Sequence, residues 1–202
     1  MNVAIIGSGN VGRALAGALR RAGHQVSFGV KSPDPGQPDQ ASVPDAVGRA
    51  QATILAVPFA AVGDVVTAAG GFAGKILIDA TNPLGMVEGG LGLTMGFTTS
   101  GAEQVAALAP QARVFKAFNQ TGFENMADTR PYAQRPVMFV AGDDAEGKRT
   151  VLALVADAGF EAVDAGGLRA ARLLEPFAML WIELARKQGV GSNFAFSLQR
   201  KA

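Results

Sequence analysis

The stretch GSGNVG at residues 7–12 constrains the fold of this chain more than any other feature. The apolar run NVAII leads into it and VGRALAGALRRAG leads out, which predicts a buried strand, a tight turn and a helix. The glycine spacing is typical of a dinucleotide-binding turn. Gly7 permits the turn, Gly9 lets the backbone approach a pyrophosphate, and Gly12 allows close helix–strand packing. Because backbone N–H groups at the helix start would meet the phosphates, we predict a dinucleotide site here.

Apolar runs alternate with helical patterns along the rest of the chain. The early runs are continuously apolar, which indicates strands buried on both faces of a parallel sheet. The order strand, helix, strand therefore predicts a doubly wound α/β sheet. Strands are predicted at residues 2–7, 25–30, 52–57, 75–80, 113–118, 136–142 and 160–165, and helices at 101–109, 144–158 and 168–188.

The C-terminal part of the chain contains a long helix, residues 168–188, that is apolar on more than one face. We expect this helix to dock against the first domain and against a dimer partner, with a kink at Pro176. The stretch NFAFSL at 193–198 reads as a strand whose apolar stripe needs covering. The expected organisation is a dinucleotide-binding domain at 1–125 with an extension at 126–202, or one continuous domain.

Two irregular stretches follow strand ends, where ligands bind in α/β sheets. Residues 32–45 hold four prolines, and residues 84–101 are rich in glycine. A loop as long as the second is uncommon in a compact domain unless it has a function. Both stretches are therefore expected to border the ligand site.

The composition excludes several classes of site. The 202 residues include no cysteine and one histidine, His24, which excludes a disulfide framework, a cysteine nucleophile and a thiolate or histidine metal site. We therefore predict no metal. Lys and Arg total 18 against 17 acids, so nothing favours nucleic acid or a membrane as a partner. Without a membrane-spanning or signal-peptide pattern, we expect a cytoplasmic protein.

The residues after the second strand indicate which dinucleotide binds. An NAD site usually has Asp or Glu there to hold the ribose 2′-hydroxyl, whereas this chain reads Gly29-Val30-Lys31-Ser32. No carboxylate repels a 2′-phosphate, and Lys31 and Ser32 could bind one. We therefore predict NADP(H) as the cofactor.

Five segments together resemble one known family. They are GSGNVG at 7–12, ILAVP at 54–58, DATNPL at 79–84, KAFNQTGFENM at 116–126 and GGLRAARLLEP at 166–176. Jointly, over nearly the whole chain, they resemble the NADPH-dependent coenzyme F-420 reductases. These are also called F-420-dependent NADP oxidoreductases, and their domain recurs in STEAP-type metalloreductases. The resemblance implies a Rossmann-type doubly wound, mainly parallel sheet with a small helical C-terminal extension. It also implies a homodimer and hydride exchange between NADP(H) and a deazaflavin.

The resemblance implies site residues by position, from the pyrophosphate at the glycine turn to the deazaflavin near Asn119. The expected cofactor-binding residues are Gly7, Ser8, Gly9, Asn10, Val11, Gly12, Val30, Lys31, Ser32, Val57, Pro58, Phe59, Ala80, Thr81, Asn82 and Pro83. The expected substrate-side residues are Phe118, Asn119, Thr121 and Gly122. The archaeal members that use F-420 differ from this chain at two places: they have Ser-Arg at the positions of Val30-Lys31 and His at the position of Asn119.

Hydride transfer between two bound rings needs positioning within about 3–3.5 Å and little acid–base work, so no catalytic side chain is predicted. An alcohol dehydrogenase would need a proton acceptor near the hydroxyl carbon, and Lys116 is the only candidate base near a suitable strand end. Strand alternation places Lys116 opposite Ala117 and on the same face as Phe118.

The leading hypothesis is an NADPH-dependent oxidoreductase whose small-molecule acceptor is F-420 or a flavin. The alternatives are an NADP-dependent dehydrogenase of a small hydroxy compound and a non-catalytic NADP(H)-binding, redox-sensing module.

Overall fold

The strand, turn and helix predicted at the N-terminus are present in the computed structural model, which describes residues 1–201. Strand β1 (Asn2–Ile6) runs into the glycine turn, and helix α1 (Asn10–Arg21) leaves it. Because Val3 to Ile6 are all apolar, β1 is buried on both faces and lies inside the sheet, between β4 and β2.

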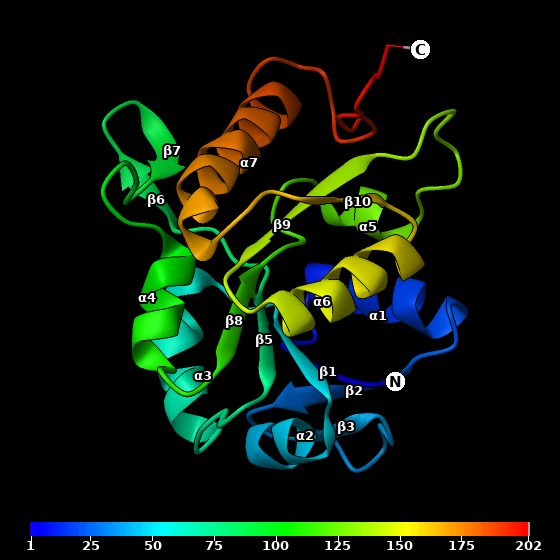
Figure 1. Cartoon of the computed structure of the whole chain (residues 1–202), viewed down its shortest axis with the longest axis vertical. Coiled ribbons are helices and arrows are strands. Elements are labelled where there is room, and N and C mark those ends of the chain that lie inside the picture. The colour runs from blue at the N-terminus through cyan, green and yellow to red at the C-terminus, as the bar shows by residue number, and fades with distance from the viewer. Residues whose placement is uncertain (202) are drawn as a thin grey trace.

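One eight-stranded sheet crosses the molecule in the order β10-β9-β8-β5-β4-β1-β2-β3 (Figure 1). Its further strands are β2 (Gln25–Val30), β3 (Gln40–Ser42), β4 (Ala52–Leu55), β5 (Ile76–Asp79), β8 (Arg113–Lys116), β9 (Val137–Gly142) and β10 (Glu161–Asp164). β8 and β9 pair antiparallel and the other neighbours pair in parallel, so the predicted mainly parallel α/β fold is confirmed. The sheet also continues past residue 125, because β9 and β10 belong to it.

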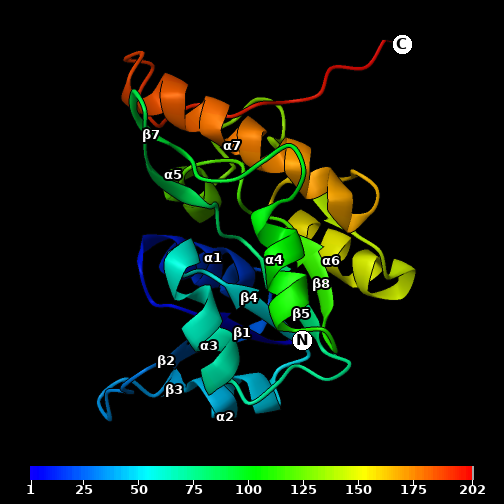
Figure 2. The ribbon, with the colours of Figure 1, turned by 90° about the vertical axis from the view of Figure 1, so that its left-hand side faces the viewer.

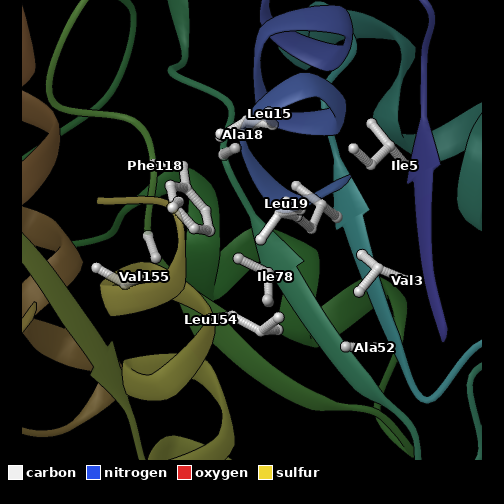
Figure 3. Close-up of a cluster of buried hydrophobic side chains, with 14 of the residues drawn as sticks. Val3, Ile5, Leu15, Ala18, Leu19, Ala52, Ile78, Phe118, Leu154 and Val155 are labelled. Atoms are coloured by element: carbon white, nitrogen blue, oxygen red, sulfur yellow. The ribbon is translucent and has the colours of Figure 1, made fainter. Parts of the chain in front are cut away.

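Helices cover both faces of the sheet. They are α2 (Val43–Arg49), α3 (Val62–Ala68), α4 (Gly101–Leu108), α5 (Phe123–Ala127), α6 (Ala145–Asp157) and α7 (Ala171–Arg186), with single 3-10 turns at Phe59–Ala61 and Leu168–Ala170. Alternate residues of β1 face opposite layers: Val3 and Ile5 pack with α1 and α6 (Figure 3), whereas Ala4 and Ile6 pack with α2, α3 and α4.

Both stretches that the sequence presents as irregular contain regular elements. The proline-rich stretch 32–45 includes β3 and the start of α2, where the Ser42 Oγ accepts from the Asp45 N–H at 3.3 Å. The glycine-rich stretch 84–101 includes the hairpin of β6 (Leu84–Val87) and β7 (Gly90–Leu93). Strands of only three or four residues, two of them interrupted by glycine, and a proline in the first helical turn leave little periodic pattern to detect.

The C-terminal tail corrects the expectation of a strand at 193–198, because these residues form no regular element. Their aromatic side chains pack on α7 of the same chain: Phe194 stacks on Trp181 with ring centroids 5.3 Å apart, and Phe196 lies 4.7 Å from Phe177. The two phenylalanines of the apolar stripe are therefore covered within the protomer, whereas Leu198 is 37% exposed. Figure 2 shows α7 running beside the hairpin, at the end of the molecule where the chain terminates.

Within residues 1–201, no helix combines the length and the apolar character needed to cross a membrane. His24 is held by contacts to the N-terminal amine and to Asp157.

Candidate functional site

The glycine turn contains two glycines that the fold requires and one that it does not. Gly7 has a φ of 108°, and a Cβ there would lie 2.5 Å from the Ala56 carbonyl oxygen. A Cβ on Gly12 would lie 2.1 Å from the Gly7 carbonyl oxygen. By contrast, a Cβ on Gly9 would meet no protein atom within 4 Å, and its φ of −74° suits any residue. Gly9 therefore leaves space that the protein itself does not fill.

The N-terminus of α1 borders this space and has no side-chain cap. Helices α2, α4 and α6 are capped by Ser42, Ser100 and Asp144, whose side chains accept a backbone N–H of the first turn, whereas α3, α5 and α7 resemble α1 in having no side-chain cap. No such bond is present at Gly9, and the first turn of α1 has no acidic residue. Its N–H groups and the positive end of its dipole therefore suit a phosphate.

The other predicted cofactor residues follow neighbouring strands at the same edge of the sheet. Backbone hydrogen bonds continue the β1–β4–β5–β8 ladder one residue beyond the strands, at 2.9 to 3.3 Å. Residues 57–59, 80–83 and 118–122 therefore begin side by side, next to the glycine turn. Of these, Pro58 is exposed and Asn82 is half-buried, whereas Thr81 and Pro83 are buried.

Asn82 and Asn119 join two of these segments directly. The Asn82 Nδ2 donates to the Asn119 carbonyl at 2.9 Å, and the Asn119 Nδ2 donates to the Asn82 Oδ1 at 3.0 Å. Asn119 also donates to the Leu174 carbonyl in α7 and accepts from Gln120. Asn119 is only 4% exposed. Because its amide donates both to Asn82 and to the Leu174 carbonyl, it joins the Asn82–Asn119 pair, which forms a wall of the site, to α7.

The remaining substrate-side residues differ in how they are placed. Phe118 has a φ of 62°, is fully buried, and packs edge-on against Phe160. Its left-handed backbone breaks the strand alternation, so its ring joins Ala117 on the α1–α6 face. The expectation that Phe118 shares a face with Lys116 is therefore wrong. Thr121 and Gly122 are half-buried at the start of α5.

A buried charge cluster lies behind the site. The Lys116 Nζ contacts the Asp79 Oδ2 at 2.9 Å and the Glu175 Oε1 at 2.8 Å, and it donates to the Thr81 carbonyl at 2.7 Å. All three charged side chains are at most 1% exposed. Thr81 in turn donates its N–H and hydroxyl to the Asp79 Oδ1. The cluster thereby fixes the segment that begins at Thr81.

The same cluster anchors two helices. Glu175 projects from α7 and accepts the Gly101 N–H at 2.9 Å and the Ala102 N–H at 3.1 Å, at the start of α4. The positive end of the α4 dipole offsets part of the second carboxylate charge. Lys116, which the sequence offered as the only base near the site, is thus an enclosed ion-pair partner that a substrate does not reach.

Comparison with known proteins assigns a family to this arrangement. Residues 2–83 match the model described as NADP oxidoreductase, coenzyme F420-dependent. A proposed F420-dependent NADP reductase of Arthrobacter sp. FB24 is 33% identical, and the match covers 99% of this chain and 100% of that one, with a TM-score of 0.89. The chain belongs to the F-420-dependent NADP oxidoreductase family. Its fold and its glycine turn are those of a family of NADP-dependent oxidoreductases.

Two further relatives widen the comparison. A hypothetical protein of Sinorhizobium meliloti is 29% identical over 85% of this chain and 87% of its own, with a TM-score of 0.73. Metalloreductase STEAP3 of Rattus norvegicus is 30% identical over 179 residues, which are 86% of this chain and 35% of that protein. The chain therefore spans about a third of the length of the curated metalloreductases that it matches.

In this family member, the residues expected at the 2′-phosphate are only partly arranged as a binding site. Val30 is half-buried against the core, and Lys31 and Ser32 are exposed. The three lie next to the glycine turn, because the Gly7 N–H donates to the Gly29 carbonyl at 3.1 Å. A lone lysine supplies a point charge and lacks the two-pronged geometry with which arginine holds a phosphate.

Sequence reasoning missed the partners that position the site. Asp79 lies in the DATNPL motif and Glu175 in GGLRAARLLEP, and the sequence alone predicts no role for either. A charged residue within an apolar strand or helix was the available signal, because such residues are almost never fully buried unless paired.

Proposed function

We propose that this chain transfers a hydride between NADP(H) and a deazaflavin or flavin-type acceptor at the carboxyl edge of its sheet. The observation that carries the proposal is the combination of an open glycine turn with strand-end segments that carry no ionisable side chain. The segments 57–59, 80–83 and 118–122 contain no ionisable side chain. Three ionisable residues lie nearest to them: Asp79 and Lys116 are enclosed in an ion-pair cluster, and Glu124 is in the first turn of α5, beside Gly122.

The residues fit the cofactor that the family implies. The open space beside Gly9 and the uncapped start of α1 would take the pyrophosphate. Pro58 and the Asn82–Asn119 pair would border the nicotinamide. Bound NADP(H) supplies the hydride chemistry, and the protein contributes binding, orientation and exclusion of water.

The two alternative functions make different demands. A dehydrogenase of a small hydroxy compound needs a group that accepts the hydroxyl proton, and the burial of Lys116 between two carboxylates disfavours it. A non-catalytic NADP(H)-binding module needs no acceptor at all. Turnover of any acceptor distinguishes an enzyme from such a module.

The test is an acceptor panel. Purified protein and NADPH are mixed with F-420, FMN, FAD or a ferric chelate, and, in reverse, NADP⁺ is mixed with small hydroxy acids. We expect NADPH oxidation with F-420 or a flavin and no NADP⁺ reduction by hydroxy acids. Turnover of a hydroxy acid, or NADPH binding without turnover of any acceptor, would contradict the proposal.

Two glycine variants, one test variant and one matched control, locate the cofactor in this assay. Gly9→Val fills the space predicted for the pyrophosphate and should abolish NADPH binding. Gly48→Val lies on α2, where an added Cβ also meets no atom within 4 Å, and should leave binding unchanged. Equal activity of both variants would place the cofactor elsewhere.

We also propose that the protein is a homodimer that pairs through α7 and the adjacent hairpin. Leu173 and Leu180 on α7 are 72% and 48% exposed, and Met86 on the hairpin is 80% exposed. Isolated exposed apolar side chains are ordinary on a monomer, but a group of them on adjacent elements marks an interaction surface. The shared position of these side chains on α7 and the hairpin is what supports the proposal.

A further inference from the structure

A hollow of about 460 Å³ lies between α1 and the loop that joins β2 to β3. Ser8 of the glycine turn and Arg13 of α1 line it, and Phe28 of β2 contributes its ring. None of Val30, Lys31 and Ser32, the residues expected at the 2′-phosphate, is among its lining residues. The hollow therefore extends the cofactor edge toward the outer side of α1.

The charged side chains that line the hollow differ in how many of their polar atoms have hydrogen-bond or ion-pair partners. Arg20 donates to Asp39 at 2.7 Å and lies over the Phe28 ring at 5.5 Å, and Asp34 accepts the Gly36 N–H at 2.8 Å. Arg13 is exposed and uses its Nε to donate to the Ser8 carbonyl at 2.7 Å. Within residues 1–201, its two terminal nitrogens have no hydrogen-bond or ion-pair partner.

The bond to Ser8 fixes where this free end of Arg13 can act. In dinucleotide sites the adenosine ribose lies where the glycine turn meets the chain leaving the second strand. In this chain those segments touch through the Gly7 N–H and the Gly29 carbonyl. A phosphate on the ribose 2′-oxygen would therefore lie between Lys31 on one side and Ser8 with Arg13 on the other.

We propose that Arg13 is a specificity-determining residue that binds the 2′-phosphate of NADP(H). The inference rests on the proposed function, since it assumes that the glycine turn holds the cofactor. Arg13 supplies from α1 the planar fork that Val30 and Lys31 do not supply from the end of β2. Its Nε is held by Ser8, which orients the two terminal nitrogens before the cofactor arrives.

The test is calorimetric titration of NADPH and NADH into the unmodified protein, Arg13→Ala, Arg13→Lys and Lys31→Ala. Arg149→Ala, an exposed arginine on α6, is the matched control. We expect Arg13→Ala to weaken NADPH binding about tenfold or more and to leave NADH binding nearly unchanged. Arg13→Lys should restore part of the loss, and Lys31→Ala should cost less than Arg13→Ala because its contact is an exposed point charge.

The outcomes separate the inference from the proposed function. If the unmodified protein binds neither dinucleotide, the proposed function fails. If it prefers NADPH and Arg13→Ala keeps that preference, the inference fails and the proposed function stands. Equal loss of NADPH and NADH affinity in Arg13→Ala also overturns the inference, since Arg13 would then act on the shared part of the cofactor. Unchanged NADH binding shows that the variant is folded.

Discussion

Replacing Lys116 by methionine should strongly destabilise the protein. The change keeps the length of the side chain but removes an ammonium that contacts Asp79, Glu175 and the Thr81 carbonyl at 2.7 to 2.9 Å, all in the interior. Removing one partner of a buried ion pair costs about 3–5 kcal/mol, because the remaining charge is left uncompensated. At about 2–4 °C per kcal/mol for a chain of this size, the melting temperature should fall by about 6–20 °C.

The assay is urea unfolding and thermal melting of three variants. Lys187→Met is the matched control: Lys187 pairs with Glu183 at 2.9 Å, but both side chains are about 40% exposed, so it should cost about 0.3–0.5 kcal/mol. Glu175→Gln should fall between the two, because the amide can still accept one hydrogen bond. A cost for Lys116→Met no larger than that of the Lys187 control would refute the reasoning.

Three other predictions test separate parts of the structure. Val30→Asp should reverse the preference from NADPH to NADH in calorimetry, since a carboxylate there repels a 2′-phosphate and accepts from ribose hydroxyls; continued NADPH preference would contradict it. Glu103→Gln should lower stability at neutral pH, where Arg172 holds the pKa of Glu103 below its usual range, and the deficit should shrink as pH falls through that pKa; a deficit that grows in acid would contradict it. Leu173→Glu with Leu180→Glu should convert the dimer to monomers in sedimentation; an unmodified protein already monomeric at micromolar concentration would refute the dimer.

The parts of the fold that the sequence predicted are those encoded locally. A buried parallel strand is a continuous apolar run, and the glycine turn joins one such run to an amphipathic helix, so both are visible without tertiary information. Strand β3 and the β6–β7 hairpin are not predicted from the sequence, because strands of three or four residues are too short to show a period, and glycine interrupts the apolar residues of the hairpin. The tail was mistaken for a strand because its alternating phenylalanines pack against α7 rather than into a sheet.

The missed parts of the site depend on contacts between distant segments. Glu175 meets the start of α4 across 74 residues of sequence, and Asn119 reaches Leu174 across 55. Neither partnership leaves a local pattern, so the sequence shows the residues but not their engagement. The left-handed backbone at Phe118 likewise overrides the alternation that would place its ring beside Lys116. Positioning of the site is therefore a tertiary property, whereas the glycine turn is a local one.

The central claim, direct hydride transfer from NADPH held at the glycine turn, is tested by isotopic labelling at the nicotinamide C4. NADPH deuterated on one or the other face of C4 is oxidised with whichever acceptor reacts, and the NADP⁺ formed is analysed by mass spectrometry. A cofactor oriented by the Asn82–Asn119 wall presents a single face to the acceptor, so one epimer should give NADP⁺ that keeps the deuterium and the other NADP⁺ that has lost it. Mixed products from both epimers, or no oxidation with any acceptor, would contradict the account.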